Sequence, residues 1–363
     1  MENTWTFRCA KSGRSVAAYA WMPGIDTGDR ASTNADEFGA AGVVFLLHGF
    51  RSHAEFNFLL SFPPDKYEVY HGSLVQKLNE RGYIVFAHDH PYHGRTEGEP
   101  RGLFEGHEIM IDTFLQFVRE AMTKYKLRPD LQKFCVGHSL GGALAIGTCL
   151  REPELFRAAV FSSAAVSAPK NMLGWKGWFL MQIAWAAATL VPQWEFMGMA
   201  ENHVFPERHE LFLNDPLTVK IGVMARSGYE FVRLYQMIAA GASELSTPFL
   251  ITDGSEDTLV DKDGVEAFHA KAPVADKSCK IYEGILSWTD LKLARVSRKT
   301  SCTTYHKIYC RRHAANLLVL LRGCLPVHFG CTRTNLFHAL ILVVDFLILH
   351  ALPESLVIFG WIQ

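Results

Sequence analysis

The chain has 363 residues, of which 49% are hydrophobic, so it can bury the core of one or two domains. Its 36 basic and 37 acidic side chains leave a net charge of -1, which gives no electrostatic reason to expect nucleic acid as a partner. No secretory signal pattern opens the chain, and its eight cysteines lack the spacing of a small secreted domain. We therefore expect a cytoplasmic globular protein with reduced thiols.

Strand and helix patterns alternate along most of the chain. Two β-rich runs joined by a polar turn, Trp5–Cys9 and Ser15–Trp21, predict an antiparallel sheet edge. The further strands are expected at residues 42–50, 82–89, 134–138, 158–164, 247–253 and 280–283, and the helices at residues 72–81, 106–125, 140–151 and 263–271. This alternation predicts an α/β fold with a mostly parallel, doubly wound sheet.

A serine between glycines lies where the strand at 134–138 passes into a helix. In Gly137-His138-Ser139-Leu140-Gly141, the glycines leave room for a sharp turn that exposes the Ser139 hydroxyl as a nucleophile. The backbone N–H of Leu140, in the first helical turn, is expected to face the oxyanion of an attacked carbonyl. The alternative is a glycine-rich turn whose serine has no chemical role. The preceding strand and the small-residue helix that follows favour the nucleophile.

An earlier strand supplies the second expected oxyanion donor. The uninterrupted apolar run from Gly42 ends in His48-Gly49-Phe50, the pattern of a strand buried on both faces of a parallel sheet. Its loop is expected beside the serine turn, with the Phe50 N–H as the donor. Alternatively, His48 and Gly49 only end the strand.

Residues 168–240 interrupt the alternation of strands and helices. The apolar stretch Gly177–Ala188 predicts a helix, and the whole segment predicts a helical cap over the strand ends, where open α/β sheets bind ligands. The cap's apolar surface suggests an apolar substrate. Its side chains either line an acyl channel or only pack the cap onto the core.

A carboxylate-rich loop follows the strand at 247–253. Asp257 comes three residues after Gly254, at the sheet edge where the acid of a catalytic triad must stand to orient a histidine. Three other carboxylates are rivals for this role: Asp253, Glu256 and Asp261.

Four histidines in or near one stretch raise the question of a metal site: His88, His90, His93 and His107. Their spacing contains no helical i, i+4 pair and no set of thiolates or carboxylates in ligand geometry. We therefore expect no metal and no cofactor.

Several motifs together resemble the α/β-hydrolase family, within it the monoacylglycerol lipase and serine-aminopeptidase-like (S33) group. They are Leu47-His48-Gly49-Phe50, Asp89-x-x-Tyr92-His93-Gly94-Arg95-Thr96-x-Gly98, Gly137-His138-Ser139-Leu140-Gly141-Gly142 and Gly254-Ser255-Glu256-Asp257. The resemblance covers residues 5 to 286, although the family usually has Gly and Ser where Tyr92 and Thr96 stand. It implies Ser139 as nucleophile, Asp257 as acid, the Phe50 and Leu140 amides as oxyanion hole, and glycerol monoesters of fatty acids as substrates.

The chain departs from the family where the catalytic histidine is expected. The family has Tyr-x-Gly-x-x-His after the last strand, whereas Tyr282 and Gly284 are followed here by Ser287. The five later histidines lack the family spacing: His306, His313, His328, His338 and His350. We expect a hydrolase domain at residues 1–286 and an atypical, poorly ordered tail at 287–363, which carries four of the eight cysteines. A coding-sequence error or a divergent terminus would explain both features.

The apolar stretch Leu336–Leu352 lies in this tail. It has 17 residues, slightly fewer than a membrane span needs, and Asp345 near its middle costs about 2.5 to 3.5 kcal/mol on insertion scales. A membrane helix and a poorly packed apolar stretch are the two alternatives. Peripheral contact with membranes or lipid droplets is expected because the cap would have to collect a lipid.

Two functions follow from these observations. The first is a serine ester hydrolase that acts on monoacylglycerols or related lipid esters through an acyl-enzyme. The second is a catalytically impaired hydrolase-fold protein that keeps the pocket and binds an apolar ligand, since Ser287 cannot act as the base.

Overall fold

The computed structural model describes residues 4–24, 40–62, 66–167, 174–198, 206–255, 257, 260 and 262–282. The chain divides into two units, Met1–Asp290 and Leu291–Gln363, and every described residue lies in the first. Three sequence expectations therefore fall outside the described residues: Ser287 in place of the histidine, the five tail histidines, and the apolar stretch Leu336–Leu352.

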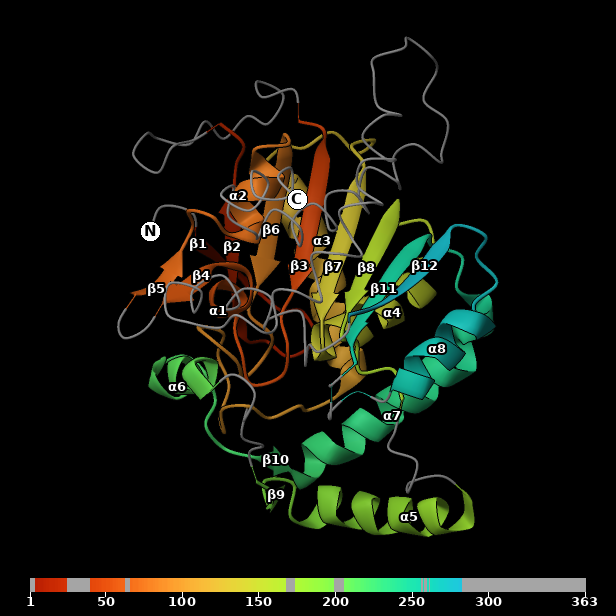
Figure 1. Cartoon of the computed structure of the whole chain (residues 1–363). Coiled ribbons are helices and arrows are strands. Elements are labelled where there is room, and N and C mark those ends of the chain that lie inside the picture. The colour runs from red at the N-terminus through yellow and green to blue at the C-terminus, as the bar shows by residue number, and fades with distance from the viewer. Residues whose placement is uncertain are drawn as a thin grey trace, which may run out of the picture. The chain divides into compact units, whose positions relative to one another are not determined.

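An eight-stranded sheet forms the centre of the first unit (Figure 1). Its strands, in chain order, are β1 (Thr4–Arg8), β2 (Ser15–Trp21), β3 (Gly42–Leu47), β6 (Tyr83–His88), β7 (Lys133–His138), β8 (Ala158–Ser162), β11 (Phe249–Gly254) and β12 (Lys277–Tyr282). Their order across the sheet is β1-β2-β6-β3-β7-β8-β11-β12. Only the β1–β2 and β2–β6 pairs are antiparallel, which confirms both the predicted edge and the mostly parallel sheet.

The central strands are buried on both faces because helices cover the sheet. All residues of β3 and β6 are buried, as their uninterrupted apolar sequences predict. The covering helices are α2 (Leu74–Asn79), α3 (His107–Lys124), α4 (Leu140–Arg151) and α8 (Lys262–Lys271). In α3, apolar residues three or four apart form the inner stripe, and Phe114 and Phe117 pack their rings against Phe45 of β3. Each such buried ring contributes about 2–3 kcal/mol to folding.

Two short elements follow β3 that the sequence patterns do not reveal. Helix α1 (Ala54–Phe58) is a single turn capped by His53, and β4 (Leu60–Phe62) pairs with β5 (Lys66–Val69) in a small separate hairpin. Both are too short for a hydrophobic period to show in the sequence. Their position matters because α1 follows directly on the loop that was expected to carry the second oxyanion donor.

Four helical elements and two short strands are described between β8 and β11, in the segment where a cap is predicted. They are α5 (Gly174–Leu190), β9 (Glu195–Met197), α6 (Pro206–Asn214), β10 (Val223–Met224), α7 (Ala225–Gly241) and the 3₁₀ turn η3 (Ala242–Glu244). Helix α7 packs against α3 and α4, and α5 packs against α7 (Figure 1). Among the described residues, no helix is long and apolar enough to cross a membrane.

Candidate active site

Ser139 occupies a strained turn between β7 and α4. Its backbone angles are φ 53° and ψ -117°, a conformation that costs a non-glycine residue about 1–3 kcal/mol. The surrounding chain holds this turn: the Ser139 N–H donates to the Ser162 carbonyl at 2.9 Å, and the Ser139 carbonyl accepts from Ala143 N–H at 3.1 Å and Ala165 N–H at 3.3 Å. The strand-turn-helix arrangement predicted around the serine is therefore present.

The glycines on either side of Ser139 are required by close backbone contacts. A Cβ atom at Gly137 would clash with the Gly141 carbonyl and lie 2.7 Å from the Gly142 Cα. A Cβ atom at Gly141 would clash with the Leu47 carbonyl and lie 2.6 Å from the His48 carbonyl oxygen. The turn is thus packed directly against the end of β3, and only glycine allows that approach.

The loop after β3 lies beside the serine turn. A Cβ atom at Gly49 would be 3.0 Å from His138 Nδ1 and 3.4 Å from Ser139 Cβ. Asn57 joins the two segments: its Oδ1 accepts from the Gly49 N–H at 3.0 Å, and its Nδ2 lies 3.2 Å from His138 Nδ1. The loop of residues 49–53 and the serine turn therefore form one packed assembly.

The two predicted oxyanion donors come from these two segments. Within the described part of the chain, no group accepts a hydrogen bond from the backbone N–H of Phe50 or of Leu140. Leu140 also begins α4, whose N-terminus carries the positive end of the helix dipole. Both amides are thus available to a negatively charged oxygen, and their catalytic role stays a prediction.

Two described carboxylates at the end of β11 and in the loop after it, Asp253 and Asp257, differ in their environment. Asp253 is buried, and its Oδ1 accepts from the Gly254 N–H at 3.0 Å. Burial, with the nearby Asp257 charge, raises the pKa of Asp253 to about 7. Asp257 is partly exposed, and its Oδ1 accepts from the Val260 N–H at 2.9 Å. A triad acid must be ionised to stabilise a histidine cation, so this difference favours Asp257. The rivals Glu256 and Asp261 lie outside the described residues.

The cluster of histidines near the site is structural. His48, His88, His90 and His93 are all buried, and burial is the main cause that lowers the pKa of each. His48 Nε2 accepts from the His90 N–H at 2.9 Å, and His90 Nε2 donates to the His48 carbonyl at 2.9 Å. His107 pairs instead with Glu230. No group of His, Cys, Asp and Glu within the described ranges could hold a metal ion.

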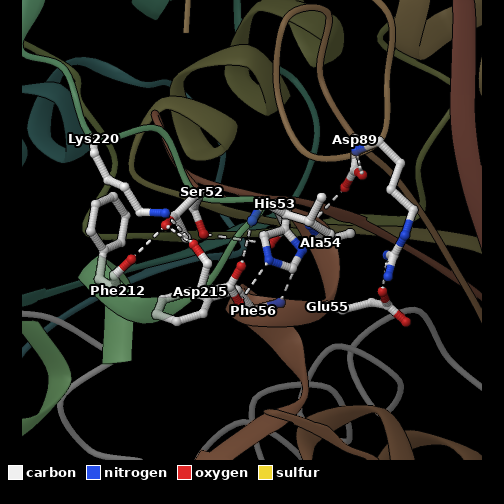
Figure 2. Close-up of polar contacts among 12 residues, drawn as sticks. Ser52, His53, Ala54, Glu55, Phe56, Asp89, Phe212, Asp215 and Lys220 are labelled. Atoms are coloured by element: carbon white, nitrogen blue, oxygen red, sulfur yellow. Dashed lines mark hydrogen bonds and ion pairs between the residues drawn. The ribbon is translucent and has the colours of Figure 1, made fainter. Parts of the chain in front are cut away.

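Sequence patterns did not identify two residues that lie next to the predicted loop. His53 and Asp215 form a buried pair, with His53 Nε2 3.2 Å from Asp215 Oδ2 (Figure 2). A polar residue shortly after a parallel strand is a usable signal for His53, because ligands bind at the carboxyl ends of such strands. No such signal exists for Asp215, because it stands 162 positions away in sequence.

Asp89, from the second motif of the resemblance, fixes the far end of the same loop. Its Oδ1 accepts from the Ala54 N–H at 2.8 Å, and its Oδ2 accepts from the Arg95 N–H at 2.7 Å and the Tyr19 hydroxyl at 2.7 Å. The Arg95 side chain also contacts Glu55. Asp89 therefore anchors the start of α1 to the sheet through both oxygens of its carboxylate.

Comparisons with known proteins agree with this geometry. A family model described as serine aminopeptidase, S33, matches residues 39–286. The monoglyceride lipase of Homo sapiens is 28% identical over 270 residues, 73% of this chain and 80% of that protein. The monoacylglycerol lipase of Mycolicibacterium smegmatis is 26% identical over 246 residues, 67% and 80% of the two chains. The structure of a monoacylglycerol lipase from Paleococcus ferrophilus has the same fold, with a TM-score of 0.57, 19% identity and coverage of 74% and 89%.

Proposed function

The chain belongs to the serine aminopeptidase S33 family of α/β-hydrolases, and from this membership we propose that it hydrolyses monoacylglycerols or related lipid esters. The observation that carries the proposal is the strained Ser139 turn, packed against the loop that bears Phe50. Two relatives with 26–28% identity are named as lipases of this substrate class, which supports the choice of ester.

The proposed reaction proceeds through an acyl-enzyme. Ser139 Oγ attacks the ester carbonyl, and the Phe50 and Leu140 amides stabilise the oxyanion that forms. The base takes the Ser139 hydroxyl proton during the attack and gives it to the alcohol as the bond to the alcohol breaks. Water then attacks the acyl carbonyl and gives a proton to the base, which returns it to Ser139 as the fatty acid leaves. Asp257 orients the base and stabilises its cation. The position at which the family carries that base is Ser287, outside the described residues.

The cap supports a lipid substrate. Its exposed side chains include an unusual number of large apolar groups: Ile183, Trp185, Leu190, Val191, Trp194, Phe196 and Met197. All seven lie between residues 183 and 197, and exposed apolar side chains concentrated in one segment favour contact with a partner or a membrane. The proposal therefore includes peripheral contact of the cap with a membrane or lipid-droplet surface.

Serine-directed labelling and ester turnover test the proposed reaction. The wild-type protein is expected to react with a fluorophosphonate probe and to hydrolyse a glycerol monoester, whereas Ser139→Ala loses both. Ser162→Ala is the matched control, because Ser162 holds the turn through its backbone carbonyl and its hydroxyl has no partner among the described residues. Absence of Ser139-dependent labelling and turnover would refute the proposed hydrolase activity.

The base is tested with two further sets of variants. A large gain in turnover from Ser287→His would show that the wild-type chain works without an efficient base. Loss of turnover from one substitution among His306, His313, His328, His338 and His350 would identify a base in the tail. The comparisons give no support to the non-catalytic alternative.

Membrane contact is tested by sedimentation with phosphatidylcholine vesicles. The double variant Trp185→Ser and Trp194→Ser is expected to bind these vesicles more weakly, because both indoles are more than half exposed on the cap. Turnover of a water-soluble ester should stay unchanged. Equal vesicle binding by the variant and the wild type would exclude this face as the contact.

A further inference from the structure

The loop that carries Phe50 is tied to the cap at three places. The Val219 N–H donates to the Arg51 carbonyl at 2.8 Å, and Arg51 Nη1 donates to the Ile221 carbonyl at 3.1 Å. The third tie joins His53 Nε2 to Asp215 Oδ2 at 3.2 Å. All three partners lie between α6 and β10, so one short cap segment, residues 215–221, spans the loop.

The His53–Asp215 tie is buried and fully hydrogen-bonded. The His53 and Asp215 side chains are 0% and 2% exposed. His53 Nδ1 accepts from the Phe56 N–H at 3.5 Å, which leaves Nε2 as the donor to Asp215 (Figure 2). Asp215 Oδ1 accepts from the Leu217 N–H at 2.8 Å. Burial alone would raise the pKa of Asp215, and the hydrogen bond and charge of His53 lower it.

The middle of the loop depends on these ties. The Asn57 side chain holds its first residue, Gly49, and Asp89 holds the residue after His53. Between them, Arg51 has φ 63°, a left-handed conformation that a side chain other than glycine adopts only under constraint. Phe50 is the neighbour of Arg51, so the direction of its N–H follows the backbone that the cap holds.

We propose that His53 and Asp215 are positioning residues that couple the cap to the oxyanion hole by holding the Phe50 amide in place. The proposal rests on the function proposed above. It adds that the cap, besides covering the substrate, influences how well the Phe50 amide stabilises the transition state. A misplacement of about 1 Å at such a donor costs on the order of 10²-fold in rate. The tie therefore acts on kcat, whereas a cap that only binds substrate acts on KM.

Steady-state kinetics on a soluble glycerol monoester separate these roles. Asp215→Ala is expected to lower kcat about 10- to 100-fold and to leave KM within about 3-fold. His53→Ala should behave in the same way, and the double variant should be no worse than either single one, because both remove the same tie. Lys220→Met is the matched control, because Lys220 Nζ donates to the Asp215 carbonyl at 2.6 Å and, among the described residues, forms no hydrogen bond with residues 49–53.

If Asp215→Ala folds poorly, Asp215→Asn and amide hydrogen exchange still test the proposal. Asparagine keeps the shape but offers one acceptor where Asp215 uses two, so it weakens the bond to His53 or to Leu217. We expect a smaller loss of kcat, about 3- to 10-fold. Amide exchange in a peptide spanning residues 48–58 should be faster in Asp215→Asn and Asp215→Ala than in the wild type and Lys220→Met.

Two results would overturn the proposal: a folded Asp215→Ala with kcat within 2-fold of the wild type, or a raised KM with unchanged kcat. If the wild type shows no Ser139-dependent turnover, the proposed function fails instead. The tie is then judged by exchange alone, and unchanged exchange at residues 48–58 in both Asp215 variants would refute it.

Discussion

Replacing Gly141 by alanine tests whether the serine turn needs its close approach to β3. The added Cβ would clash with the Leu47 carbonyl oxygen and lie 2.5 Å from its carbon and 2.6 Å from the His48 oxygen. Ordinary contacts of a Cβ atom begin at 3.4 Å, so β3 and α4 must separate by about 1 Å. These neighbours are backbone atoms that cannot rotate away.

The cost of this separation follows from overpacking. Inserting a carbon into a well-packed region costs about 1–3 kcal/mol, and the rigid neighbours place Gly141→Ala near 3 kcal/mol. At about 2–4 °C per kcal/mol for a domain of this size, the melting temperature should fall by about 6–12 °C. Because the shift moves Ser139 relative to Phe50, kcat should fall on the order of 10²-fold.

Differential scanning fluorimetry and ester turnover measure the two effects. Gly198→Ala is the control, because a Cβ atom there has no neighbour within 4 Å, and it should stay within about 0.5 kcal/mol of the wild type. A Gly141→Ala protein that melts and turns over like Gly198→Ala would show that the described packing around Ser139 is wrong.

Four further predictions concern titratable groups and the cap. Burial lowers the pKa of His88, so below about pH 6.5 this side chain binds a proton in the unfolded chain but not in the folded one. The melting temperature should therefore fall between pH 7 and pH 5, and His88→Leu should make this fall smaller. An equally large fall in His88→Leu would contradict the prediction. The pKa of Asp253 is raised to about 7 from 3.8, so its ionisation destabilises the folded protein as the pH rises from 4 to 7. Asp253→Asn should therefore raise the free energy of unfolding by up to about 4 kcal/mol at pH 8, measured by urea denaturation. Its turnover should change little. In a Ser287→His background, where the histidine that Asp257 would orient is present, Asp257→Asn should instead lower kcat by about 10⁴. The reverse pattern in that background would move the role of acid to Asp253. Ile183 is half-exposed on α5, and Ile183→Lys should raise KM for a long-chain monoester more than for an acetate ester. Equal increases in KM for the two esters would show that α5 does not select the acyl chain.

The serine turn was predictable because its signals are local in sequence. Gly137 and Gly141 are needed at the positions where the backbone approaches itself, and the apolar runs before and after them define a strand and a helix. The same holds for the central strands, whose burial on both faces leaves an uninterrupted apolar sequence. Short elements such as α1 and the β4–β5 hairpin were not predicted, because a single helical turn or a strand of three residues is too short to show a hydrophobic period.

Neighbouring residues alone define the α/β architecture, the order of its elements and the candidate nucleophile, because each of these depends on patterns that are local in the chain. The tertiary structure decided which distant side chains support that nucleophile's surroundings. His53 meets Asp215 across 162 residues, and Asp253 acquires its raised pKa only through burial beside Asp257. Burial and partnership are properties of the folded chain, because desolvation and hydrogen bonding depend on which segments pack together in space.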